Sequence, residues 1–131
     1  MTVVRHRGRC ECGSVEFDVA LSRTAATVCH CSQCRRTSGH LWAAVRAEYN
    51  ALTFLKADGL RWYASSNHAN RGFCAICGSS LFYRMNDETG IGIAAGAFDT
   101  PTGFTVGRHI FTASKGDYYD IAQDAPHLEE A

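Results

Sequence analysis

Cysteine spacing is the feature of this sequence that most limits how the chain can fold. The chain has seven cysteines in three groups, namely Cys10 with Cys12, then Cys29, Cys31 and Cys34, then Cys74 with Cys77. Closely spaced cysteines are typical of zinc sites, in which four thiolates surround one ion. Because two closed sites of this kind would need eight thiolates, the seven cysteines predict one complete site and one three-cysteine site.

The spacing also predicts how the cysteines divide between the two zinc ions. A Cys-x-Cys or Cys-x-x-Cys turn gives one ion two thiolates, at about 2.3 Å per zinc–sulfur bond. We therefore pair Cys10 and Cys12 with Cys74 and Cys77 in a structural zinc site that closes a long loop of chain. The remaining three cysteines lie on one local turn, and their fourth ligand has to come from elsewhere.

Two alternatives remain open for the three-cysteine group. In the first, a histidine completes the site and both zinc ions are structural. The candidate histidines are His30, His40, His68 and His109. In the second, a single zinc ion is present and the three clustered thiols are free or redox-active.

Hydrophobic periodicity predicts a mainly β fold with little helix. Val15, Phe17, Val19 and Leu21 alternate with more polar residues, which is typical of a strand that buries one face. One short helix is predicted over 32–38, with Gly39 as its C-terminal cap. Turn residues separate the further predicted strands. The strands cover 41–47, 52–56, 60–64, 80–85, 91–98 and 107–113.

Length and charge restrict the kind of protein. The chain of 131 residues suits a single domain, 1–131, in which we expect residues 122–131 to form a loosely held tail. Thirteen basic residues balance thirteen acidic ones, which gives no electrostatic basis for binding nucleic acid or an acidic membrane. Since no stretch has transmembrane length and Met1 to Cys10 lacks the apolar core of a secretion signal, we expect a cytoplasmic protein.

The charge of a three-thiolate zinc favours thiol chemistry over hydrolysis. Three thiolates outweigh the two positive charges of zinc, so that the metal acidifies a bound water less than a three-histidine zinc does. A soft, sulfur-rich zinc instead suits an incoming thiol, which it binds as the thiolate beside an electrophile. A thiol that adds to an aldehyde forms a hemithioacetal, and the reverse reaction breaks the same carbon–sulfur bond.

The cysteine groups and their neighbours resemble the glutathione-dependent formaldehyde-activating enzyme family, which also contains centromere protein V. The resemblance is carried by residues 8–13, 29–39 and 72–79, and by His109-Ile110-Phe111 with Ser114-Lys115. It implies an Mss4-like fold of coiled antiparallel β-sheets with zinc-binding hairpin turns. It also implies a structural zinc on Cys10, Cys12, Cys74 and Cys77, and a catalytic zinc on Cys29, Cys31 and Cys34. The implied activity is that of a carbon–sulfur lyase that joins glutathione and formaldehyde in S-(hydroxymethyl)glutathione.

Fewer residues can be assigned to the substrate. Arg35 and Arg36 follow the last cysteine of the middle group and can donate charge-assisted hydrogen bonds to a carboxylate of a glutathione-like thiol, or can be solvated. Lys115 can reach the same cleft, or can pair with Asp117 or Asp120. The alternative to an enzyme is a noncatalytic, zinc-stabilised scaffold that binds a protein partner through its sheets.

Overall fold

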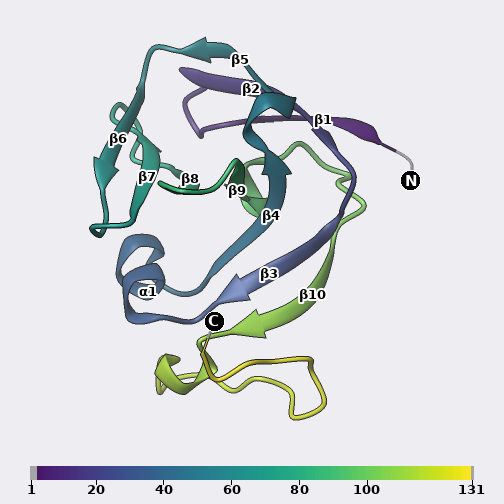
Figure 1. The fold of residues 1–131 in the computed structure, drawn as a ribbon, viewed down its shortest axis with the longest axis vertical. Coiled ribbons are helices and arrows are strands. Elements are labelled where there is room, and N and C mark those ends of the chain that lie inside the picture. Colours follow the sequence, from purple (N-terminus) through teal and green to yellow (C-terminus); the bar gives the residue numbers. More distant parts are fainter. Residues whose placement is uncertain (1–2, 131) are drawn as a thin grey trace.

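The computed structural model of the protein describes residues 3–130 and folds them into two β-sheets, with α1 (Ser32–Ser38) beside them (Figure 1). The smaller sheet has the strand order β1-β2-β5, and the larger one has the order β10-β3-β4-β9-β8-β7-β6. The strands are β1 (Val4–Arg9), β2 (Val15–Leu21), β3 (Ala25–Cys29), β4 (Trp42–Glu48), β5 (Leu52–Ala57), β6 (Leu60–Ala64), β7 (Ala69–Cys74), β8 (Ser80–Met85), β9 (Gly90–Ala94) and β10 (Thr105–Ile110). The predicted mainly β fold is confirmed.

The core forms between the two sheets around the alternating side chains of β2. Val15, Phe17, Val19 and Leu21 are each at most 1% exposed, as their period of two predicts. The Phe17 ring packs edge-on against Phe82 of β8, with ring centroids 5.5 Å apart. Burial of each large apolar side chain contributes about 1.5–3 kcal/mol. The smaller sheet is therefore held against the larger one chiefly by the inner face of β2.

Helix α1 has the bounds that the sequence predicts. Its C-terminal cap is Gly39, with φ 87°, and the Gly39 N–H donates to the carbonyl of Arg35. This left-handed conformation is the one that favours glycine after a helix. Within residues 3–130, no helix combines the length and the apolar character that a membrane crossing requires.

Two predicted strands end earlier than expected. The prediction of a strand over 91–98 is wrong at its end, because Ala95–Ala97 form a short 3-10 turn, η2, in which the N–H of Phe98 bonds the Ala95 carbonyl. The strand predicted over 107–113 likewise ends at Ile110, since Phe111 adopts a left-handed φ of 56° and residues Thr112–Ser114 form another 3-10 turn, η3. A third such turn, η1 (Tyr49–Ala51), joins β4 to β5.

The last strand departs from the antiparallel pattern. β10 pairs with β3 in parallel, whereas the other named strand pairs of both sheets are antiparallel. Figure 1 shows β10 beside β3 at the edge of the larger sheet, with the C-terminal segment folded back beyond it. This pairing brings residues after 110 close to the end of β3, where Cys29 lies.

The C-terminal segment, expected as a loose tail over 122–131, is tied to this strand over part of its length. The N–H of His109 donates to the Pro126 carbonyl, and the N–H of Leu128 donates to the His109 carbonyl, both at 2.9 Å. Phe111, Thr112 and Ala113 donate in the same way to carbonyls of residues 128–130. Ala131 lies outside the described residues. Residues 126–130 thus form part of the hydrogen-bonded structure.

Candidate metal centres

The first candidate centre lies where a hairpin of the smaller sheet meets a hairpin of the larger sheet. Cys10 and Cys12 lie in the turn between β1 and β2, and Cys74 and Cys77 lie at the turn between β7 and β8. The four sulfur atoms all lie within 4.8 Å of one another. The Cys10–Cys12 and Cys12–Cys74 sulfur separations are 3.6 and 3.8 Å, close to the ~3.8 Å edge of a tetrahedron with 2.3 Å zinc–sulfur bonds. The geometry therefore fits one tetrahedral ion that joins the two sheets.

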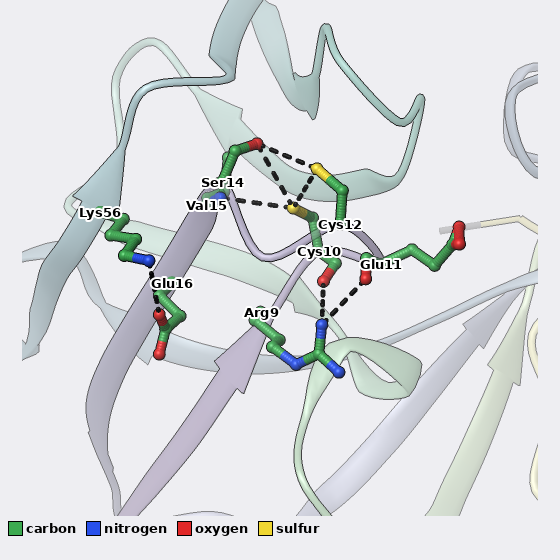
Figure 2. Close-up of polar contacts among 8 residues, drawn as sticks. All are labelled: Arg9, Cys10, Glu11, Cys12, Ser14, Val15, Glu16 and Lys56. Atoms are coloured by element: carbon green, nitrogen blue, oxygen red, sulfur yellow. Dashed lines mark hydrogen bonds and ion pairs between the residues drawn. The ribbon is translucent and has the colours of Figure 1, made fainter.

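Hydroxyl and amide groups surround these sulfurs. The Ser14 hydroxyl lies 3.1 Å from the sulfur of Cys12, and the N–H of Val15 donates to the Cys10 sulfur at 3.3 Å (Figure 2). The same hydroxyl also lies 3.1 Å from the Cys74 sulfur. Burial opposes ionisation of Cys77, but hydrogen bonds from Ser79 and from backbone groups outweigh it and lower the pKa of the Cys77 thiol to about 5. Such donors stabilise thiolates, which is the form that binds zinc.

The turn between β5 and β6 approaches the same centre so closely that it needs a glycine. A Cβ atom on Gly59 would lie 2.5 Å from the Ser14 hydroxyl oxygen and 2.7 Å from the Cys74 sulfur. The Gly59 carbonyl accepts the N–H of Ala75 at 2.7 Å. Three turns of the chain thus converge on the four sulfurs.

The second candidate centre is built from the end of β3 and the first turn of α1. Cys29 is the last residue of β3, Cys31 is the N-cap of α1, and Cys34 lies in its first turn with 3% of its surface exposed. The Cys31 sulfur accepts the N–H of Cys34 at 3.3 Å. The three sulfurs lie within 4.8 Å of one another, and no histidine, cysteine or carboxylate of residues 3–130 joins them. Soft thiolates at this spacing fit zinc, and the described residues supply three of its usual four ligands.

The histidines that were candidates for the fourth ligand make other contacts. His30 is 1% exposed, and its Nδ1 and Nε2 lie 2.6 Å from the Tyr119 hydroxyl and 2.9 Å from His109 Nδ1. Burial is the main cause that lowers the pKa of His30, and the electrostatic effect of nearby His109 lowers it further. His40 Nδ1 lies 2.9 Å from the Tyr118 hydroxyl, and His68 Nδ1 lies 3.2 Å from the side-chain oxygen of Asn67. In the described structure, none of these four histidines closes the three-cysteine group.

Arg71 of β7 also lies at this centre, although no sequence motif marks it. Its side chain is buried, its Nη2 donates to the Cys34 sulfur at 3.4 Å, and its Nε donates to the Gln33 side-chain oxygen at 2.9 Å. The guanidinium lies against the Trp42 and Tyr83 rings. The Cys29 thiol as donor and Arg71 as cation outweigh burial and lower the pKa of Cys34 to about 6. Its burial comes from the packing of strands and α1, which no local sequence pattern signals.

The basic residues assigned to the substrate have different surroundings. Arg36 of α1 is exposed, and Arg35 is half-buried, with its Nε making no hydrogen bond to the described residues. The Lys115 ammonium donates to the backbone carbonyls of Gly116 and Tyr119, at 3.0 and 2.6 Å. Among residues 3–130 it forms no salt bridge with Asp117 or Asp120.

An open cleft of about 660 Å³ lies beside the four-cysteine centre and extends to the end of α1. Its lining includes Cys10 and Ser79 near the four-cysteine centre, and Ser38 and Trp42 near the end of α1. Trp42 packs in the same hydrophobic cluster as Cys34. Volumes of this size hold small-molecule ligands.

The fold and these centres define a two-sheet β protein with two sulfur-rich candidate metal centres, one with four protein ligands and one with three. Comparison with known proteins identifies the family. Residues 5–114 match the family described as glutathione-dependent formaldehyde-activating enzyme, and the chain belongs to that family.

Two relatives agree with this assignment. The chain is 25% identical over 118 residues to an uncharacterized lyase of Schizosaccharomyces pombe, covering 89% of this chain and 85% of that protein. It is also similar to a Rhodobacter sphaeroides protein of known crystal structure, a structural-genomics target, with a TM-score of 0.60 and 28% identity. That alignment covers 72% of this chain and 88% of the other.

Proposed function

We propose that the protein is a zinc-dependent carbon–sulfur lyase of this family, with a catalytic zinc held by Cys29, Cys31 and Cys34. Its substrates are a small thiol of the glutathione type and an aldehyde such as formaldehyde. The observation that carries the proposal is the unequal number of ligands, since four protein sulfurs gather at one centre and three at the other, without a fourth from the described residues. The four-cysteine centre then holds a structural zinc.

The proposed reaction forms one carbon–sulfur bond. Zinc bound by three thiolates supplies a soft Lewis acid that prefers a sulfur ligand. The thiol sulfur donates an electron pair to the aldehyde carbon, the carbonyl π pair moves to oxygen, and the proton lost by the thiol ends on that oxygen. With glutathione and formaldehyde the product is S-(hydroxymethyl)glutathione. The reverse, lyase direction returns the same proton and breaks the same bond.

The surrounding residues are suited to binding and to excluding water. Trp42 and Tyr83 pack against the cysteine cluster on its apolar side. The cleft beside Trp42 has room for the rest of a tripeptide-sized thiol. Arg35 and Arg36 are our candidates for contacts with its carboxylates, because they lie on the helix that carries Cys34. Lys115 is the third candidate. Its ammonium donates hydrogen bonds to backbone carbonyls of 116–119, so that it would influence the substrate by positioning this segment.

The family and one relative support this choice of chemistry. The family's description names glutathione and formaldehyde, and the Schizosaccharomyces pombe relative is named a lyase. An alternative in which the protein is a noncatalytic scaffold would need no exchangeable position at the three-cysteine centre.

A titration of the two-zinc protein with glutathione, followed by zinc X-ray absorption, tests the proposal. We expect the average number of sulfur ligands per zinc to rise from 3.5 toward 4, because only one of the two ions gains a thiol. Addition of ¹³C-formaldehyde should then give a hydroxymethyl carbon. Its exchange with free formaldehyde, measured by NMR, should be faster than in protein-free solution. Cys31→Ser is the matched control and should show neither change. No thiol entry at millimolar glutathione would instead favour the scaffold.

A further inference from the structure

We propose that Arg71 is the internal counter-ion of the three-cysteine centre, a positioning residue that holds the Cys34 thiolate and strengthens metal binding there. The inference rests on the proposed function, because it takes the three cysteines to bind zinc as thiolates. It concerns a residue outside all three cysteine groups, on a strand whose sequence, Ala69–Cys74, contains no other arginine, lysine, aspartate or glutamate.

The first observation is the burial of the Arg71 guanidinium without a carboxylate partner. Arg71 is 4% exposed, and among the described residues no aspartate or glutamate forms a salt bridge with it. A buried charge without an opposite charge is strongly disfavoured. The Cys34 sulfur, 3.4 Å from Nη2, is the group that supplies the negative charge when it is ionised.

The second observation is that the guanidinium is held in one orientation. Its Nε donates to the side-chain oxygen of Gln33, and the Gln33 amide nitrogen donates to the Ser65 carbonyl, each at 2.9 Å. The ring centroids of Trp42 and Tyr83 lie 5.5 and 4.8 Å from the guanidinium carbon. Nη1 is buried without a hydrogen-bond acceptor among the described residues. Aromatic faces at this distance attract a cation and replace part of the missing solvation.

The charge of the centre changes when Arg71 is included. Zinc with three thiolates carries a net charge of −1, and the guanidinium brings the whole to zero. A thiolate that enters the fourth position then gives −1 in place of −2. Relative to three neutral thiols, both the assembly of the metal site and the entry of an anionic sulfur ligand add negative charge beside Arg71, and its guanidinium therefore favours both.

Cobalt binding to the second site tests this role without any measurement of activity. Protein loaded with one zinc ion is titrated with Co²⁺ in competition with a chelator, and the sulfur-to-cobalt charge-transfer band reports the three-cysteine centre. We expect Arg71→Met to weaken this site about 10- to 100-fold, as loss of a charge-assisted hydrogen bond does. Arg71→Lys keeps the positive charge. Its cobalt affinity should recover at least half of the decrease in log affinity that Arg71→Met causes.

The matched control is Arg84→Met. Arg84 lies on the neighbouring strand β8, its guanidinium carbon lies 3.7 Å from the centroid of the Tyr49 ring, and it forms no hydrogen bond to a cysteine of residues 3–130. Its replacement should leave cobalt affinity within twofold of wild type. An unchanged affinity in Arg71→Met, or an Arg71→Lys variant as weak as Arg71→Met, would overturn the inference. If the wild-type protein binds no second ion at all, the proposed function fails, which is a distinguishable result.

Should Arg71→Met fail to fold, NMR of the wild-type protein supplies the test. The Arg71 side-chain Nε–Hε resonance is expected to shift when the second equivalent of metal is added and not with the first. The absence of such a shift at full loading of the second site would equally overturn the proposal.

Discussion

The two centres should contribute differently to stability, and a pair of cysteine-to-serine variants measures the difference. Cys10 is 2% exposed and lies in the main core, where its sulfur would help to join β1–β2 to β7–β8. Cys31 belongs to a single local turn. Serine at position 31 also keeps a good N-cap for α1, because its hydroxyl can accept the N–H that the Cys31 sulfur accepts now. We expect Cys10→Ser to lose the fold and Cys31→Ser to keep it.

The magnitude follows from the lengths of chain that the metals close. Cys12 and Cys74 are 62 positions apart, and a cross-link over such a loop stabilises the folded state by about 4 kcal/mol. The loop from Cys29 to Cys34 is so short that its contribution is about 2 kcal/mol smaller. A loss of about 4 kcal/mol removes much of the 5–15 kcal/mol that stabilises a typical domain.

The assay is urea unfolding followed by tryptophan fluorescence, with zinc content measured on the same samples. Cys10→Ser should be largely unfolded at 37 °C or have a much lower unfolding midpoint. Cys31→Ser should remain folded with one zinc ion in place of two. Equal destabilisation by both substitutions, or two zinc ions retained in Cys31→Ser, would refute the division into structural and catalytic centres.

Three further predictions concern the framework. Gly59→Ala should lower the free energy of unfolding by about 1–3 kcal/mol, because its Cβ would lie within 3 Å of two side-chain atoms at the four-cysteine centre; Gly96→Ala, with open space around it, should not. Phe17→Ala should cost about 3–5 kcal/mol in chemical denaturation, and Leu55→Ala, at an exposed position, much less. Deletion of residues 126–131 should speed amide hydrogen exchange at His109 and 111–113, whose N–H groups donate to that segment. Unchanged exchange there would show that the segment is not bound to the sheet in solution.

The sequence was sufficient to predict the features that depend on short-range patterns. The alternation in Val15–Leu21 predicts β2, and Gly39 in the C-terminal capping position predicts the end of the short helix α1. The three cysteine groups divide into the two sets that the structure brings together. In each case neighbouring residues carry the signal.

Features that depend on tertiary packing were not predictable in this way. β7 contains Asn70 and Gly72, which are poor strand formers, and it becomes a strand because β6 and β8 pair with it on both sides. The same packing buries Arg71 beside Cys34. The parallel pairing of β10 with β3 joins segments about eighty positions apart, and no local pattern reports such a contact.

The position of β3 between β4 and β10 sets an order for assembly during synthesis. A ribosome has delivered every sulfur of the four-cysteine centre once Cys77 has emerged. At that moment β3 can pair with β4 alone, since its other neighbour, Thr105–Ile110, has not yet been translated. The nascent chain can therefore fasten its two sheets together before the strand that ends in Cys29 is enclosed. The four-cysteine centre can thus form first, and the end of the larger sheet that carries the three-cysteine group is completed by the last quarter of the polypeptide.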